Sequence, residues 1–341
     1  MAQTPAFIQT LVTSTRIRLA RNLAGYPFPE KMDELLAEEV VYLVEKSLKE
    51  LDDFEKQDMT QLSREEATLL QEQHLISPAL IRKKGMAAAF LSADKSVSIM
   101  VNEEDHLREQ YIYKGFDLYK AYEHISAIDE GLGAKLDFAY DDKLGYLTAC
   151  PSNVGTGMRA SVMMFLPGLA KNNGLKDFLP TLKASGLTVR GVFGEGTAAE
   201  GYSYQVSNER TLGMSESEIL DQMVRMTMQL CDLELKAREK MLQEEKIPLK
   251  DECLRAFGAL TNCAVLPLKE LTAGMVKVKL GIALGFFKAQ NIQDFNDFVA
   301  DMRPASFRLE NGLRKASEYE CDLMRAEIVH KVLPELVVRQ D

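Results

Sequence analysis

Five arginines in this sequence each lie inside a short local motif, and their type and spacing suggest chemistry on phosphate. An arginine side chain presents a planar fork of hydrogen-bond donors that matches phosphate oxygens, and it stays charged at any workable pH. If the fold brings the five guanidinium groups together, they would form a clamp for a polyphosphate. The five residues are Arg16, Arg18, Arg108, Arg159 and Arg190.

Two glutamates and one cysteine belong to the same motifs and suggest a reaction at the terminal phosphate. Glu104 precedes one of the arginines, Cys150 opens the segment that leads to another, and Glu195 follows the last. Ser152 stands two residues after the cysteine, where its hydroxyl can hydrogen-bond a thiolate and stabilise it. Glu104, Cys150 and Glu195 are therefore candidates for chemistry on the terminal phosphate.

Other polar and glycine-rich segments nearby carry weaker signals. Glu103 and Asp105 could support Mg²⁺ or its waters, or they could be an ordinary solvated acidic cluster. Residues 194–201 contain three glycines and are typical of a lid that closes over a nucleotide. Residues 155–157, Gly-Thr-Gly, are not a P-loop, because no Gly-Lys-Ser/Thr follows them.

Length and composition limit the class of protein. A chain of 341 residues is long for a single core, so we expect two domains. No apolar run approaches the roughly 18 residues that span a bilayer, and the N-terminus does not resemble a signal peptide. Five scattered cysteines without a CxxC pair favour a reducing cytoplasm over a disulfide framework or a zinc site. A formal charge of −10 argues against nucleic-acid binding but permits a basic protein as substrate.

The elements expected to position the motifs in the first part of the chain are mostly strands. Residues 14–20 alternate, which predicts a strand with the first two arginines on one face and Ile17 and Leu19 on the other. The further predictions are a helix over 31–51, a hairpin over 86–91 and 96–101, a hairpin over 135–140 and 146–150, a helix from about Arg159, and strands over 186–193 and 202–207.

The pattern becomes helical in the last third of the chain. Ser215-Glu216-Ser217-Glu218 resembles a capping box and predicts one long helix over 215–246. Helical patterns follow Pro248, with breaks near 281–285 and at Pro304. The sequence therefore predicts an α+β catalytic domain over residues 1–240 and an all-α C-terminal domain over residues 241–341.

Taken together, the motifs resemble those of the ATP:guanidino phosphotransferases, the family of creatine kinase and arginine kinase. The resemblance extends over about residues 12–237. It rests on Ser14-Thr15-Arg16-Ile17-Arg18, on residues 102–108 and 150–160, on Arg190-Gly191 with Gly194-Glu195, and on residues 207–216. It implies an antiparallel sheet flanked by helices, similar to that of glutamine synthetase, with ATP and Mg²⁺ as cofactors.

The resemblance also implies residue roles. Glu104 would be the catalytic base, Glu195 a second glutamate that grips an arginine guanidinium, and Cys150 a thiolate that orients it. The five arginines would contact the phosphates, and His74 would lie against the adenine. No side chain is predicted to bind a metal directly. The remaining residues expected at the nucleotide are Ser14, Ala160, Ser161, Val162, Met163, Gly191 and Gly194, together with Glu195.

Within this family, the bacterial protein arginine kinases of the McsB type are the most similar group. The chain starts about a dozen residues before the first arginine motif, so we expect it to lack the small N-terminal domain of creatine and arginine kinases. Residues 73–78, residues 159–164 and the helical tail also resemble the bacterial group. That group's phosphoarginine-binding motif, Arg-Asp-x-x-Arg-Ala, here begins with Cys321, which puts phosphoarginine-dependent regulation in doubt.

The function implied is phosphorylation of arginine residues in proteins, as a mark for degradation under stress. The implied partners are substrate proteins with exposed arginines, a zinc-binding activator protein, a Clp-type unfoldase and a second copy of the chain; nucleic acid and membranes are not expected. Two alternatives stay open: a kinase of free arginine or another small guanidino compound, and a catalytically silent adaptor that binds nucleotide or phosphoarginine.

Overall fold

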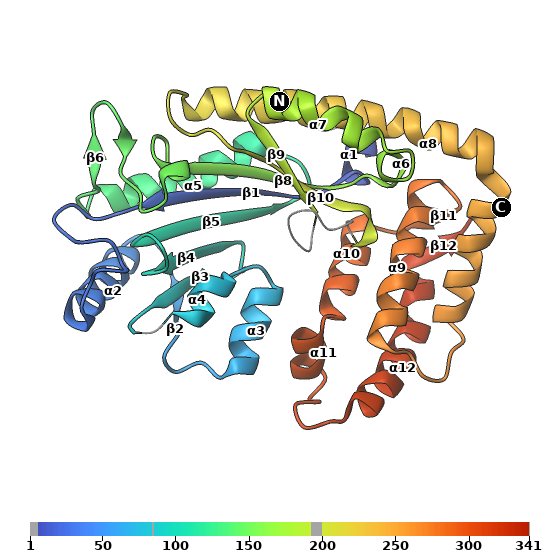
Figure 1. Ribbon diagram of the computed structural model, residues 1–341. Coiled ribbons are helices and arrows are strands. Elements are labelled where there is room, and N and C mark those ends of the chain that lie inside the picture. Colours follow the sequence, from blue (N-terminus) through green and yellow to red (C-terminus); the bar gives the residue numbers. More distant parts are fainter. Residues whose placement is uncertain (1–5, 84, 192–199, 341) are drawn as a thin grey trace.

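An antiparallel sheet of eight strands forms the centre of the computed structural model, which describes residues 6–83, 85–191 and 200–340 (Figure 1). Its strand order is β2-β3-β4-β5-β1-β8-β10-β9. The strands are β1 Val12–Arg21, β2 Phe54–Asp58, β3 Ala88–Ser92, β4 Val97–Val101, β5 Leu107–Lys114, β8 Met158–Phe165, β9 Leu187–Gly191 and β10 Ser203–Asn208. The predicted antiparallel sheet flanked by helices is confirmed.

Helices cover one face of the central strands. Helix α5 (Leu118–Gly133) packs on β1 and β5, and helix α8 (Glu216–Leu260) packs on β8 and β10. Ile17 and Leu19 of β1 point into this layer and are fully buried. Because side chains alternate along a strand, their neighbours Arg16 and Arg18 lie on the opposite face.

Several predicted elements of the first part are confirmed. Strand β1 contains the predicted strand, β3 and β4 form the predicted hairpin, and β9 and β10 match the described parts of the last two predictions. Helix α2 (Glu34–Leu48) lies inside the helix predicted over 31–51 and begins at an Asp33 cap. The hairpin predicted over 135–150 is much shorter, with only β6 (Tyr140–Asp141) and β7 (Gly145–Tyr146) paired.

The helix predicted from about Arg159 is wrong, because Met158–Phe165 is strand β8 at the centre of the sheet. Ala160, Val162 and Met164 are fully buried at every second position, which is the period of a strand. These three residues therefore cover one face of a strand, and the residues between them, Ser161 and Met163, lie on the other face.

The C-terminal part is helical, as predicted, with one addition. The capping box between Ser215 and Glu218 is present at the start of α8. The other helices are α9 Leu268–Ala283, α10 Ile292–Asp301, α11 Pro304–Glu310 and α12 Glu318–Leu336. The break predicted near 281–285 leads into a short strand, β11 (Phe287–Ala289), that pairs with β12 (Val337–Arg339). This pair of strands corrects the prediction of an all-α domain.

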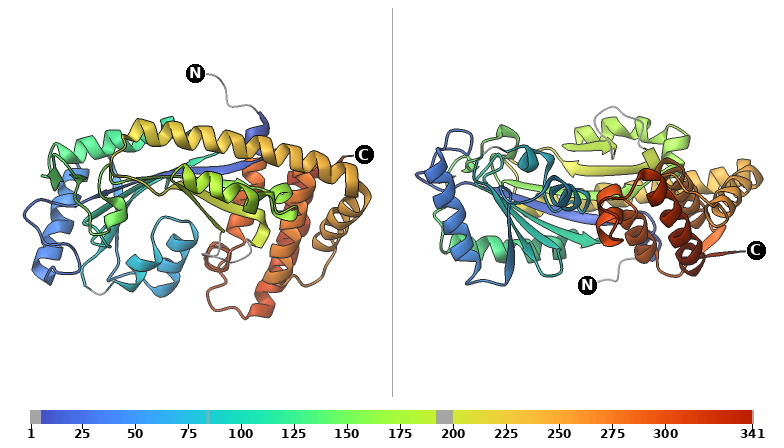
Figure 2. Two further views of the ribbon diagram at one scale, coloured as in Figure 1. Left: turned by 45° about the horizontal axis from the view of Figure 1, so that its top comes forward. Right: turned by 90° about the horizontal axis from the view of Figure 1, so that it is seen from below.

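Helix α8 contributes residues to two separate hydrophobic cores. The core of the sheet and its helices extends to Ala237, and the core of the C-terminal helices begins at Met241. Helix α8 runs through both and departs from helical geometry at Glu245. The C-terminal helices lie beside the sheet at the end away from α2 (Figures 1 and 2). Among the described residues, no helix is both long and apolar enough to cross a bilayer.

Contacts between the C-terminal helices and the sheet domain are polar. The carboxylate of Glu72, at the end of α3 (Arg64–Glu72), accepts hydrogen bonds from the backbone N–H groups of Ala305 and Ser306 in α11. Lys114 of β5 forms an ion pair of 2.7 Å with Asp297 of α10. These contacts place the start of α11 next to the segment that carries His74.

Candidate functional site

The register of the sheet gathers the arginines on the face that α5 and α8 leave uncovered. Arg18 of β1 lies opposite Gln110 of β5 and opposite Arg159 of β8. Residues paired directly across an antiparallel sheet point to the same face, so these three side chains are neighbours. Arg16 lies two residues along β1 on the same face. Arg108 lies two residues along β5.

The arginines are close enough to oppose one another's charge. The pKa of Arg16 is lowered to about 10, first by burial and then by the charge of Arg108. Burial, followed by the charges of Arg108, Arg16 and Arg159, lowers the pKa of Arg18 well below its usual range. The pKa of Arg159 is also lowered, by burial and then by Arg190 and Arg108. An anion bound beside such a cluster would offset both the burial and the mutual repulsion of these charges.

The Arg18 guanidinium has an unused donor within this cluster. Its Nε atom is buried and has no hydrogen-bond partner among the described residues. A buried N–H group without a partner costs free energy, and a ligand oxygen would remove that cost. Glu103 is the one acid whose charge opposes the lowering of the Arg18 pKa. The site therefore carries an excess of positive charge and free donors, which fits a polyphosphate.

Strands β8 and β9 extend the same face. Arg190 of β9 lies opposite Gln205 of β10, which lies opposite Met163 of β8. Met163 lies opposite Ser14 of β1. The sheet therefore brings Arg190, Met163 and Ser14 into one row across four strands. Gly191 ends β9.

Part of the predicted nucleotide segment faces the other way. Ser161 and Met163 share the face of the arginines, whereas the side chains of Ala160 and Val162 are fully buried in the core under the helices. The side chains of Ala160 and Val162 therefore do not line the face of the arginines, and the prediction that these two residues lie at the nucleotide stays a prediction. The physical reason is the alternation of side chains along a strand, which a helix would not impose.

The predicted lid and its glutamate lie outside the described residues. Residues 192–199 include Gly194 and Glu195, so the predicted roles of both residues stay predictions. Glu200, Gly201 and Tyr202 form a short 3-10 turn before β10.

His74 lies at the edge of the arginine cluster. Its carbonyl accepts a hydrogen bond of 2.7 Å from the Gln110 side chain, and its backbone has a φ of +62°. It lines a pocket of about 380 Å³ together with Arg16, Arg108 and Arg303. His74 is an exposed residue that nevertheless lies against this cationic pocket, and desolvation and then the charges of Arg16 and Arg303 lower its pKa. The imidazole is therefore neutral at pH 7.

The acidic segment, residues 102–106, is the connection between β4 and β5. Asn102 adopts the left-handed conformation, with a φ of +61°, and its side chain donates to the carbonyls of Ala37 and Met86. Left-handed backbone is more readily adopted by Asn than by most residues. The tight turn that results buries Glu103 and Asp105 and leaves Glu104 exposed.

Glu103 orients one of the arginines. Its carboxylate accepts from Arg108 Nη1 at 2.8 and 3.1 Å, and it also accepts from the hydroxyl of Ser77. Lys83 Nζ donates to the Glu103 carbonyl at 3.0 Å. The carboxylate is thus fully engaged by protein groups.

Asp105 links the acidic segment to the cysteine. Its Oδ1 atom accepts from Asn22 Nδ2 at 2.7 Å and from the backbone N–H of Ala149 at 2.6 Å. Next to it, His106 Nδ1 accepts from the Leu23 N–H, so Nε2 carries the proton and donates to a carbonyl. Neither Glu103 nor Asp105 is a solvated acid, and neither has a free carboxylate oxygen pair for a metal ion. Across the described residues, no group of three or more His, Cys, Asp or Glu could hold one.

Glu104 and Cys150 meet at the exposed edge of the cluster. The thiol lies beside the Glu104 carboxylate and acts on its pKa as a hydrogen-bond donor. Desolvation and then the charge of Asp105 raise the pKa of Glu104, and the thiol lowers it. Cys150 Sγ is also 3.0 Å from Ser152 Oγ, which is the contact that the sequence predicted.

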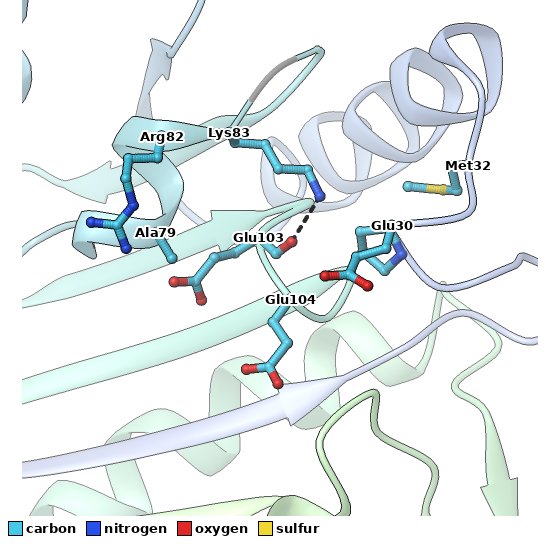
Figure 3. Close-up of a pocket in the computed structure, with 8 residues that line it drawn as sticks. Glu30, Met32, Ala79, Arg82, Lys83, Glu103 and Glu104 are labelled. Atoms are coloured by element: carbon cyan, nitrogen blue, oxygen red, sulfur yellow. Dashed lines mark hydrogen bonds between the residues drawn. The ribbon is translucent and has the colours of Figure 1, made fainter.

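Glu104 and Glu103 also line a second cavity, of about 720 Å³ (Figure 3). Glu30, Met32 and Lys83 line it together with Glu104. Glu30 places a second carboxylate in the cavity, and no pattern in the sequence indicated it. Gln110 was also missed, but its position two residues after Arg108 in an alternating strand could have identified it. Arg303 comes from the C-terminal helices and had no local signal.

The altered motif in α12 is internally paired. Cys321 is buried, and Arg325 forms an ion pair with Asp322 and donates to the Leu266 carbonyl at 2.9 Å. The Arg325 guanidinium also lies over the ring of Phe307. The two charged residues that the motif retains are therefore already engaged within the helical domain.

Two family models match the chain. One is described as the C-terminal catalytic domain of ATP:guanido phosphotransferase and matches residues 36–237. The other is described as the protein-arginine kinase McsB C-terminal domain and matches residues 246–340.

Relatives match along almost the whole length. A protein-arginine kinase of Pelotomaculum thermopropionicum is 38% identical over 334 residues, which cover 96% of this chain and 94% of the relative. A protein-arginine kinase of Halalkalibacterium halodurans is 40% identical over 298 residues, which cover 86% and 84%.

Solved structures of guanidino kinases are also similar. Lombricine kinase is 27% identical, with a TM-score of 0.61 and 67% of each chain covered. The duplicated taurocyamine kinase from Schistosoma mansoni, with bound transition-state analog components, is 27% identical, with a TM-score of 0.63 and 82% of this chain and 41% of that chain covered.

Proposed function

Because the chain belongs to the ATP:guanido phosphotransferase family, we propose that it is a protein arginine kinase, which transfers the γ-phosphate of ATP to arginine side chains of other proteins. The observation that carries the proposal is the group of mutually repelling arginines beside Glu104 and Cys150. The arginines form the part of the site that binds a polyphosphate. Glu104 and Cys150 form the part that binds a cationic acceptor.

The arginines act on the donor. Phosphoryl transfer develops negative charge on the equatorial oxygens, and fixed positive charge stabilises it. The strands hold four guanidinium groups in place for this role, those of Arg16, Arg18, Arg108 and Arg159. Glu103 orients the guanidinium of Arg108. Because the acids nearby are engaged by protein groups, Mg²⁺ would arrive on the phosphates of ATP and would supply further neutralisation there.

Glu104 acts on the acceptor. A guanidinium has a pKa above about 12 and attacks phosphate poorly until it loses a proton. Glu104 is exposed, faces the second cavity and lies beside Cys150, so it can both align the attacking nitrogen and accept its proton. As the N–P bond forms, the bond between the γ-phosphorus and the bridging oxygen breaks, and ADP leaves. Glu195 would supply a second carboxylate from the segment that follows β9 in the sequence.

The finer parts of the proposal rest on the family. They are cytoplasmic location, a homodimer, marking of proteins for degradation under stress, activation by a zinc-binding protein and delivery to a Clp-type unfoldase. The relatives named protein-arginine kinase favour a protein acceptor over free arginine. Intact Glu104, Cys150 and arginine motifs disfavour a silent adaptor.

One assay tests the proposal. Incubation with Mg-ATP and casein, followed by mapping of phosphosites under non-acidic conditions, should give phosphoarginine. Free arginine in excess should compete poorly. Glu104→Gln should abolish transfer and leave the Kd for ADP unchanged. Phosphate on serine or tyrosine, its absence from arginine, or equal loss of ADP binding in Glu104→Gln would contradict the assignment.

A further inference from the structure

Arg303 of the C-terminal domain enters the pocket of the catalytic domain that holds His74. It stands directly before α11, and its side chain lines the same pocket of about 380 Å³ as Arg16 and Arg108. One part of the pocket wall is cationic, and Ile76, Pro78 and Met100 form an apolar part. A nucleotide, with charged phosphates and a flat apolar base, has this combination of properties.

Contacts hold the Arg303 side chain at the pocket without neutralising it. Its Nη1 atom donates to the carbonyl of Glu72 and lies 3.4 Å from His74 Nε2. The Glu72 carboxylate is turned instead to the N–H groups of Ala305 and Ser306. Among the described residues, no carboxylate is in ion-pair contact with Arg303. Its charge is therefore available to a ligand.

Burial makes this arrangement costly in the absence of a ligand. The Arg303 side chain is half-buried, and desolvation lowers its pKa, while the charges of Glu72 and Asp301 oppose that shift. Arg303 adds a further partly buried cation to a pocket wall that already carries Arg16 and Arg108. A polyanion bound in this pocket would interact favourably with all three charges.

We propose that Arg303 is a nucleotide-binding residue, so that the ATP site spans both domains and nucleotide affinity depends on docking of the C-terminal helices. The inference rests on the proposed function only in taking a nucleotide as the ligand. It requires no particular acceptor. The Glu72 contacts position Arg303, because they attach the start of α11 to the segment that ends in His74.

Direct binding of Mg-ADP to the full chain, measured by calorimetry, tests the proposal. Arg303→Ala should raise the Kd for ADP by about tenfold or more, the loss of one hydrogen bond to a charged group. Arg303→Gln retains a donor for the Glu72 carbonyl but lacks the charge, and it should weaken binding as well. Both variants should show a smaller salt dependence of the Kd than the unmodified chain.

Arg314→Ala is the matched control. Arg314 belongs to the same interface and forms an ion pair of 3.4 Å with Glu66 of α3, but it does not line the pocket. This variant should bind ADP as the unmodified chain does. If both Arg303 variants bind ADP normally, the proposal is wrong. If Arg314→Ala, which removes only an exposed ion pair, weakens binding equally, Arg303 acts only through docking, and its assignment as a nucleotide-binding residue is wrong. The calorimetric experiment contains no phosphate acceptor. If arginine phosphorylation fails in a separate assay, the ADP-binding result therefore still stands.

Discussion

Substitution of Asp105 tests whether this residue supports Mg²⁺ or positions the segment that holds Cys150. The sequence allowed this residue to support Mg²⁺, whereas the structure engages it with Asn22 and with the N–H of Ala149, next to Cys150. Asp105 is 4% exposed, so these donors have little access to solvent. Loss of the carboxylate should therefore release the segment that holds the thiol.

The size of the effect follows from the two hydrogen bonds. In Asp105→Ala, the Ala149 N–H and one Asn22 N–H lose a buried acceptor, at about 1–3 kcal/mol each. We expect the free energy of unfolding to fall by about 2–5 kcal/mol. Burial also raises the pKa of Asp105, which means that part of the gain from its hydrogen bonds already offsets desolvation. Both bonds are accepted by Oδ1, so the amide oxygen of Asp105→Asn can still accept both, and this variant should lose less than half as much.

Urea unfolding and steady-state kinetics measure the two consequences. We expect kcat to fall in Asp105→Ala, because the segment that holds Cys150 loses its anchor, and to fall less in Asp105→Asn. The Mg²⁺ concentration for half-maximal rate should stay the same in both variants. Asp105→Asn with unchanged stability and a large rise in the Mg²⁺ requirement would refute this reasoning, since it would make the carboxylate a partner of the metal or its waters.

Two further predictions concern the same region. Cys150→Ala should move the acidic limb of the pH profile of kcat/KM to higher pH, because the thiol lowers the raised pKa of Glu104 and the base must be ionised to accept a proton; an unchanged limb would show that the thiol does not act on this carboxylate. Gly157→Ala should destabilise the fold by about 2 kcal/mol or more, because φ is +65° and a Cβ would lie 2.6 Å from the Ala20 carbonyl oxygen. Gly213→Ala, with φ of +75° and open space around it, is the control and should cost about 1 kcal/mol in urea unfolding.

The arginine cluster was predictable because its information is local. Arg16 and Arg18 alternate with Ile17 and Leu19, so the strand and the face that carries the charge can both be read from four residues. The register of the sheet identifies the other residues on this face, because residues two positions apart in a strand point to the same face. The same rule would have identified Gln110.

Strand β8 was mispredicted because a short apolar run has no decisive period. Residues 160–165 contain alanine and methionine, which are common in helices, and the motif before them resembles the loops that precede helices. Tertiary context decides the outcome, since β8 lies between β1 and β10 and pairs with both. The error reversed the side on which Ala160 and Val162 lie.

Arg303 and Glu30 could not be predicted from the sequence as residues of the site. Neither residue belongs to a motif, and each reaches the site because its segment docks on another element. A site built in this way divides its free energy of binding between local motifs and domain contacts such as the Glu72 cap on α11. A change at the docking surface can therefore alter nucleotide affinity without touching a single arginine motif. It follows that a chain with intact motifs can still differ in activity from its relatives, and that the difference should be sought at the interface between α3 and α11.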